Sequence, residues 1–210
     1  MAPISSFQTD IFSFVTGSVR GKDVLDVGCV AHTAASSTDP RWLHKHIVQS
    51  ARSTLGLDLL DTEAAKLRER GYNIVSGDAT TADLGATFDV IVAAELIEHL
   101  DNPGGFIRNM RRHLKPGGLL ILTTPNPFFA LHWWEWLVLD TKLKERWNPE
   151  HVCWFDPFTL TNLLTRNDFT VQSIFYFARS RQLLRVLRIL HLRCPRPLAS
   201  SFVTVAMLPN

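Results

Sequence analysis

Three apolar runs, each ended by an aspartate, constrain the fold of this chain more than any other feature. The aspartates are Asp26, Asp58 and Asp78, and the residues before them are typical of buried parallel strands. In an open α/β sheet the carboxyl ends of parallel strands meet at one crevice, where ligands bind. Gly28 follows the first run, and a glycine there can adopt a positive φ and let a ligand approach the backbone. The three acids therefore predict one ligand-binding edge of a sheet.

Strand-like and helix-like patterns alternate along the chain, which predicts an α/β fold with a doubly wound, mostly parallel sheet and helices on both faces. Besides the runs that end at Asp58 and Asp78, strands are expected at about 23–27, 88–94, 119–124, 169–177 and 202–207. A first helix is expected at 5–17, and a turn at 115–118. Four polar residues are expected to cap the later helices at their N-termini: Asp39, Asp61, Asn102 and Asp156.

The composition is that of a globular domain, because 46% of the 210 residues are hydrophobic and 20% are charged. This length predicts a single domain over 1–210. A net charge of +2, without a block of lysine and arginine, argues against nucleic acid as a partner. The first residues lack the pattern of a signal peptide, and no apolar run reaches the ~20 residues of a membrane span. A cytoplasmic protein is therefore expected.

The spacing of cysteines and histidines gives no metal-binding motif, so no metal ion is expected. The three cysteines, Cys29, Cys153 and Cys194, are odd in number and widely spaced, which favours free thiols in a reducing compartment. His44 and His46 lie two residues apart on an expected helix and therefore do not share a face.

Two segments do not fit a minimal alternating sheet. Residues 126–150 hold four tryptophans, and residues 179–200 hold a basic amphipathic helix at 181–193. Both follow the carboxyl ends of strands, so we expect them to form a rim on the substrate side. The tryptophans fit a satellite of the core, a lid over an apolar substrate or a surface that touches a membrane. The basic helix fits either packing onto its own domain or peripheral contact with an anionic membrane.

The order of these motifs resembles the class I S-adenosylmethionine-dependent methyltransferases, and most closely the branch that includes the ubiquinone and menaquinone biosynthesis methyltransferases. The resemblance rests on the three strand ends together with Phe-Asp-Val-Ile-Val-Ala-Ala-Glu-Leu-Ile-Glu-His-Leu at 88–100, Leu-Lys-Pro-Gly-Gly at 114–118 and Glu-His-Val-Cys-Trp-Phe-Asp-Pro at 150–157. It covers roughly residues 22–170. It implies a seven-stranded sheet whose last strand is antiparallel, and S-adenosyl-L-methionine as the cofactor, with S-adenosyl-L-homocysteine as the product.

The resemblance also implies roles for the residues at the strand ends. The turn of Asp26, Gly28, Cys29 and Val30 would face the methionine part of the cofactor. Asp58, with Leu59 beside it, would accept hydrogen bonds from the two ribose hydroxyls, since a carboxylate has two acceptor oxygens. The other residues expected to line the cofactor pocket are Asp78 and Ala79 at the adenine and Glu95 after the fourth strand.

One departure from the family pattern concerns the loop after the first strand. The pattern is Asp-x-Gly-x-Gly-x-Gly, but the second and third glycine positions hold Val30 and His32. A β-branched residue disfavours a positive φ and narrows the loop. The loop therefore takes a different path over the methionine end, or the affinity for the cofactor is low; we favour the different path.

His151 is the candidate catalytic residue. It precedes Trp154 and Phe155 and follows the tryptophan-rich segment, so it is expected to face the open pocket. A histidine is suited to act as general base for a hydroxyl nucleophile near neutral pH. The alternative is a hydrogen-bonded histidine that fixes the insertion. Glu98-His99 resembles a family signature that is often structural, and a chemical role for His99 is left open.

The sequence therefore predicts an enzyme that transfers a methyl group from S-adenosylmethionine to a small or lipid-linked acceptor, at an oxygen atom. A non-catalytic binding or scaffold protein of the same fold is the main alternative, because two motif glycines are missing. A nicotinamide-dependent oxidoreductase is disfavoured, since Gly-x-Gly-x-x-Gly is absent and Asp58 lies about 30 residues beyond Gly28 rather than the ~20 expected. The sequence identifies neither the acceptor nor the oligomeric state.

Overall fold

The computed structural model describes residues 10–130, 148–177 and 199–210. Most of the two expected insertions lies outside the described residues, as do the basic helix at 181–193 and the tryptophans at 133, 134, 136 and 147. The single-domain assignment over 1–210 therefore stays a prediction.

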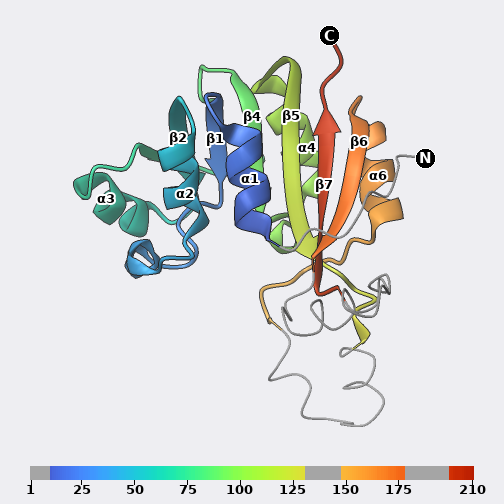
Figure 1. Cartoon of the computed structure of the whole chain (residues 1–210), viewed down its shortest axis with the longest axis horizontal. Helices are drawn as coiled ribbons and strands as arrows, with labels where there is room; N and C mark the ends of the chain where they lie inside the picture. Colours follow the sequence, from blue (N-terminus) through green and yellow to red (C-terminus); the bar gives the residue numbers. More distant parts are fainter. Residues whose placement is uncertain (1–9, 131–147, 178–198) are drawn as a thin grey trace.

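The centre of the fold is a seven-stranded sheet in the order β3-β2-β1-β4-β5-β7-β6. The strands β1 to β5 run parallel, whereas β7 is antiparallel to both of its neighbours and points the opposite way in Figure 1. The predicted fold class, with its antiparallel last strand, is confirmed. The strands are β1 (Asp23–Val27), β2 (Ser53–Asp58), β3 (Ile74–Ser76), β4 (Phe88–Ala94), β5 (Leu114–Pro125), β6 (Thr170–Phe177) and β7 (Ser201–Met207).

Helices cover both faces of the sheet, as predicted. Within the described residues they are α1 (Ile11–Val19), α2 (Leu43–Ser50), α3 (Asp61–Glu69), α4 (Pro103–Arg112) and α6 (Pro157–Thr165), with two short 3₁₀ helices, η1 (Ala34–Thr38) and η2 (Ile97–His99). Side chains of α1 and α2 form one apolar cluster with β1, β4 and β5, and side chains of α4 and α6 form another on the opposite face. In β1, for example, Val24 belongs to the first cluster and its neighbour Leu25 to the second, because successive side chains of a strand point to opposite faces.

The N-terminal caps follow the sequence at two helices and differ from it at two others. Asn102 caps α4, and Asp156 forms a capping box with Thr159 at α6. Asp39 instead ends η1, and α2 begins only at Leu43. Asp61 is the first residue of α3 rather than its cap.

The expected turn at 115–118 lies within a strand. β5 begins at Leu114, and its pairing with β4 shifts register between Phe88 and Val90, which marks a bulge. Gly117 adopts a φ of 72° there, and its N–H donates to Leu208 beyond β7. The glycines therefore bend a continuous strand instead of separating two elements.

Candidate active site

The carboxyl ends of β1, β2 and β3 are tied together by backbone hydrogen bonds. The N–H of Gly28 donates to the Leu57 carbonyl and the N–H of Gly77 to the Asp58 carbonyl, each at 2.8 Å. Leu96, after β4, packs against Gly28. A Cβ atom added at Gly28 would lie 3.2 Å from the side chain of Leu96. The strand ends predicted to form one crevice therefore meet at one edge of the sheet.

The carboxylate of Asp58 is fixed at this edge. One oxygen accepts the N–H of Val30 at 2.8 Å, and the other accepts the N–H of Leu60 at 3.1 Å. The residue is only 9% exposed. Because an ionised carboxylate has about four lone-pair sites, Asp58 retains the capacity to accept two further hydrogen bonds. This arrangement fits the two hydroxyls of a ribose.

The loop after β1 adopts a left-handed backbone conformation at three residues. The φ angles are 76° at Gly28, 53° at Ala31 and 70° at His32. Val30 avoids this conformation and is fully buried beside Cys29 and Ala34. A non-glycine residue with positive φ is strained, and here the strain lies at Ala31 and His32. His32 thus keeps the left-handed conformation at the position where the family pattern has its third glycine.

Asp26 directs its carboxylate into the protein, where it meets His44. The His44 Nδ1 atom lies 2.7 Å from an Asp26 oxygen, and both residues are almost fully buried. Burial raises the pKa of Asp26, and the hydrogen bond from His44 opposes that effect. Trp42, beside His44, donates its indole N–H to the Cys29 carbonyl at 2.8 Å. These contacts fix the turn from inside the domain.

The other predicted cofactor residues lie around the same edge. Asp78 is exposed after β3, and its carboxylate accepts the N–H and the hydroxyl of Thr80. Ala79 follows it, and its carbonyl accepts a hydrogen bond from Asn109 on α4. Leu59 is 73% exposed beside Asp58. Glu95 follows β4 with a φ of 49°, and its carboxylate accepts the Thr123 hydroxyl at 3.0 Å.

Glu98, His99 and His151 lie together beside the end of β4. The N–H groups of Val152 and Cys153 both donate to the Glu98 carbonyl, at 2.9 and 3.2 Å, which fixes the segment after residue 148 against η2. The rings of His99 and His151 meet edge to face with centroids 4.7 Å apart. His151 therefore lies against η2, next to the titratable side chains of Glu98 and His99.

Glu98 is a buried acid with an altered pKa. Burial raises the pKa of its carboxyl to about 8, with a further contribution from the nearby charge of Glu95. One oxygen accepts the Thr124 hydroxyl at 3.0 Å. Acids with raised pKa values cluster at functional sites. Sequence reasoning missed the chemistry of Glu98 and of His44, because their burial and partners depend on contacts between distant elements.

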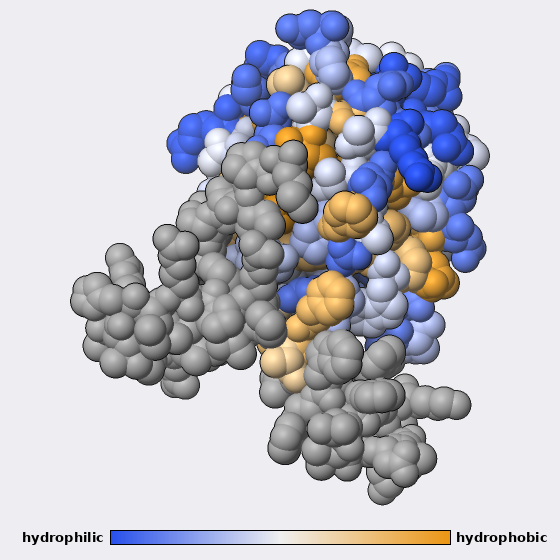
Figure 2. Space-filling view, turned by 90° about the vertical axis from the view of Figure 1, so that its right-hand side faces the viewer, coloured by the Kyte–Doolittle hydropathy of each residue, from blue (hydrophilic) through white to orange (hydrophobic). Residues whose placement is uncertain are grey.

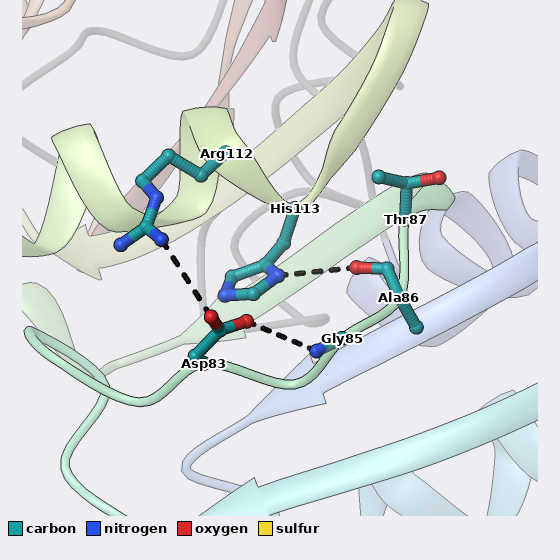
Figure 3. Close-up of a pocket in the computed structure, with 6 residues that line it drawn as sticks. All are labelled: Asp83, Gly85, Ala86, Thr87, Arg112 and His113. Atoms are coloured by element: carbon teal, nitrogen blue, oxygen red, sulfur yellow. Dashed lines mark hydrogen bonds and ion pairs between the residues drawn. The ribbon is translucent and has the colours of Figure 1, made fainter.

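A pocket of about 240 Å³ lies elsewhere, at the opposite edge of the sheet where β4 begins. Figure 3 shows Arg112 paired with Asp83 across it and His113 hydrogen-bonded to the Ala86 carbonyl. It is lined by Asp83, Gly85, Ala86, Thr87, Arg112 and His113. Because ligands of open α/β sheets bind at the carboxyl ends of strands, this pocket is not the candidate active site.

A family model described as a methyltransferase domain matches residues 9–174. The chain belongs to this methyltransferase family. This membership confirms the resemblance drawn from the sequence, and with it methyltransferase as the enzyme class and S-adenosylmethionine as the family's cofactor. The individual roles of the site residues stay predictions.

Three similar proteins illustrate the relation. The chain is 27% identical over 117 residues to a ubiquinone biosynthesis O-methyltransferase of Rickettsia conorii, covering 55% of this chain and 39% of that one. It is 30% identical over 155 residues to a probable S-adenosylmethionine-dependent methyltransferase of Mycolicibacterium smegmatis, covering 72% of this chain and 53% of that protein. The fold is similar to that of the N-methyltransferase NodS from Bradyrhizobium japonicum, solved with S-adenosylhomocysteine, with a TM-score of 0.59 and 16% sequence identity. The match covers 95% of this chain and 84% of NodS.

The similar proteins differ in the acceptor atom that their names give. The similarity in sequence includes an O-methyltransferase, and the similarity in fold includes an N-methyltransferase. The chain also spans only about half the length of the curated relatives it matches, or less. Membership of the family therefore leaves the acceptor atom undecided.

Replacing Asp58 tests the ribose contact. Asp58→Ala should weaken binding of S-adenosylmethionine by about 1.5–3 kcal/mol, the range for a hydrogen bond to a charged group. Isothermal titration measures the affinity, and circular dichroism checks that the fold persists. Asp61→Ala is the matched control, because it removes the same charge from an exposed side chain three residues away. An unchanged affinity in Asp58→Ala would remove this carboxylate from the cofactor site.

Proposed function

We propose that this chain transfers a methyl group from S-adenosylmethionine to a small or lipid-linked acceptor, at an oxygen atom. The observation that carries the proposal is the Asp58 carboxylate, held at the meeting point of the strand ends with two acceptor sites to spare. The cofactor supplies the activated methyl group when it is bound. The protein then has to bind and orient both reactants and exclude water.

Each predicted residue has a part in this proposal. The turn after β1 would lie along the methionine part of the cofactor. It consists of Asp26, Gly28, Cys29 and Val30. Asp58 would accept the ribose hydroxyls. The remaining contacts would come from Leu59, Asp78, Ala79 and Glu95. The left-handed conformation of His32 supports a loop that still admits the cofactor without the third glycine.

Exposed hydrophobic side chains support an acceptor with an apolar part. Phe128, just after β5, is 53% exposed, and Val152 and Trp154, on either side of Cys153, are 55% and 38% exposed. Figure 2 shows hydrophobic residues at the surface on the side of the molecule that carries β6 and α6. Exposed apolar side chains of this kind are typical of surfaces that bind ligands with an apolar part.

His151 supports the choice of oxygen. A hydroxyl nucleophile must lose a proton as the methyl group is transferred, and an imidazole is suited to accept it near neutral pH. The ring of His151 meets that of Trp154 edge to face, with centroids 5.5 Å apart, so an aromatic side chain flanks the proposed base. The O-methyltransferase named among the relatives agrees with this choice.

A thermal-shift titration with S-adenosylhomocysteine tests the proposed cofactor site. We expect micromolar affinity, about −8 kcal/mol. Added ligand at 100 times Kd should then stabilise the fold by ~2.7 kcal/mol. NAD serves as the control nucleotide and should produce no shift. No stabilisation at millimolar S-adenosylhomocysteine would contradict the proposal and favour a non-catalytic member of the family.

A further inference from the structure

Three potential metal ligands from distant parts of the chain lie together beside η2. Glu98 and His99 belong to η2, and His151 comes from the segment after residue 148. One ligand atom from each residue lies within 4.8 Å of the others. The two hydrogen bonds to the Glu98 carbonyl, from Val152 and Cys153, hold the segments in this position.

Glu98, one member of this cluster, has a buried carboxylate oxygen without a hydrogen-bond partner among the described residues. The residue is 1% exposed, and its Oε1 atom has no hydrogen-bond partner among the residues that the structure describes. Leaving a buried polar atom unpaired costs free energy of roughly 1–3 kcal/mol. A cation bound at this oxygen would remove that cost.

His99 is oriented as a metal ligand would be. Its Nδ1 atom lies 3.1 Å from the Glu150 carbonyl. A carbonyl can only accept, so Nδ1 carries the proton and Nε2 presents its lone pair. Metal-binding histidines are typically fixed in this way, with the second ring nitrogen donating to a carbonyl or carboxylate.

We propose that Glu98, His99 and His151 bind a divalent transition-metal ion, with Zn²⁺ as the probe of choice. Two imidazoles and one carboxylate are ligands that Zn²⁺ accepts, with bonds of about 2.0–2.2 Å, and other divalent transition metals accept them as well. The ligand atoms lie within 4.8 Å of one another and would have to move closer together on binding the ion. Three protein ligands leave a coordination position open, as in catalytic zinc sites.

The proposal differs from the sequence interpretation, which expected no metal. His99 and His151 are 52 positions apart, so no spacing motif reveals them. The inference is independent of the proposed methyl transfer, since it concerns binding of the ion alone. His151 cannot be a metal ligand and the general base at the same time, and removal of metal ions with a chelator distinguishes these two roles.

Titration of metal-free protein with Zn²⁺ against a chromogenic chelator tests the site. We expect one tight site in the wild type. Glu98→Gln, His99→Ala and His151→Ala should each weaken it by more than about 10-fold, since even residues that only support a ligand cost 10–100-fold. Glu98→Gln keeps the shape of the side chain, and thermal unfolding confirms that each variant is folded.

The matched control is His46→Ala, because His46 lies on α2 and bonds the Pro40 carbonyl, outside the cluster. It should leave the tight site unchanged. Mg²⁺ should compete weakly, because it prefers oxygen ligands. Co²⁺ should give visible absorption bands in the wild type that His151→Ala loses. The proposal is overturned if the wild type lacks a tight Zn²⁺ site, or if the three variants bind Zn²⁺ as tightly as it does.

Discussion

His44→Ala should lower the free energy of unfolding by about 3–5 kcal/mol, the combined cost of a buried polar group left without its partner and of a cavity. The Asp26 carboxyl would lose the imidazole that lies 2.7 Å away, in a place that water does not reach. The side chain of His44 is fully buried, so the change also leaves a cavity. Urea denaturation followed by circular dichroism measures the loss.

His46→Ala is the control for this experiment. His46 lies on the same helix and makes one hydrogen bond near the surface, so its removal should cost only about 1 kcal/mol. A double variant, Asp26→Ala with His44→Leu, should be more stable than the sum of the single changes predicts, because neither partner is then left alone. Equal losses for His44→Ala and His46→Ala would show that the buried pair contributes little.

The sheet could be predicted from the sequence because its signals are local. The β-branched and leucine-rich runs gave β1 at Asp23–Val27 as expected, and the acids at the strand ends were brought to one edge by parallel topology alone. Asn102 and Asp156 were correct caps, since the side chain of each accepts a backbone N–H in the first turn of its helix.

Two predicted helix caps were wrong because other contacts use the same groups. Asp39 has the residue type of a cap, but its carboxylate accepts the N–H of Arg41 and ends η1. Asp61 is not the cap of α3, because Asp58 accepts the N–H of Leu60 and the helix begins at Asp61, one residue earlier than predicted. Both errors arise where a neighbouring turn uses the same backbone groups.

Some positions in the candidate site could be predicted from the sequence, whereas contacts between distant elements could not. Asp58, Asp78 and Glu95 stand at or just after strand ends, so their position at the crevice follows from the strand pattern. The pairing of Asp26 with His44, and the burial of Glu98 against Thr124, depend on how helices and loops pack across the sheet. No spacing in the sequence encodes those contacts.

His151→Ala should lower kcat by roughly 10²–10⁴ if His151 is the general base, while the affinity for S-adenosylmethionine stays nearly unchanged. The affinity should persist because the ring packs edge to face against His99 and Trp154, neither of which is a predicted cofactor residue. Transfer of labelled methyl groups to phenols that carry an apolar chain gives kcat, and isothermal titration gives the affinity. His46→Ala should change neither quantity.

A chelator separates the two roles that His151 can have. If His151 is the base, activity of the wild type survives removal of metal ions, and the pH profile shows one group that must be deprotonated. If His151 is a metal ligand, the chelator lowers the wild type to the level of His151→Ala, and Zn²⁺ restores only the wild type. An activity that neither the chelator nor His151→Ala affects would exclude both roles. Alignment of the acceptor with the cofactor would then have to account for the catalysis.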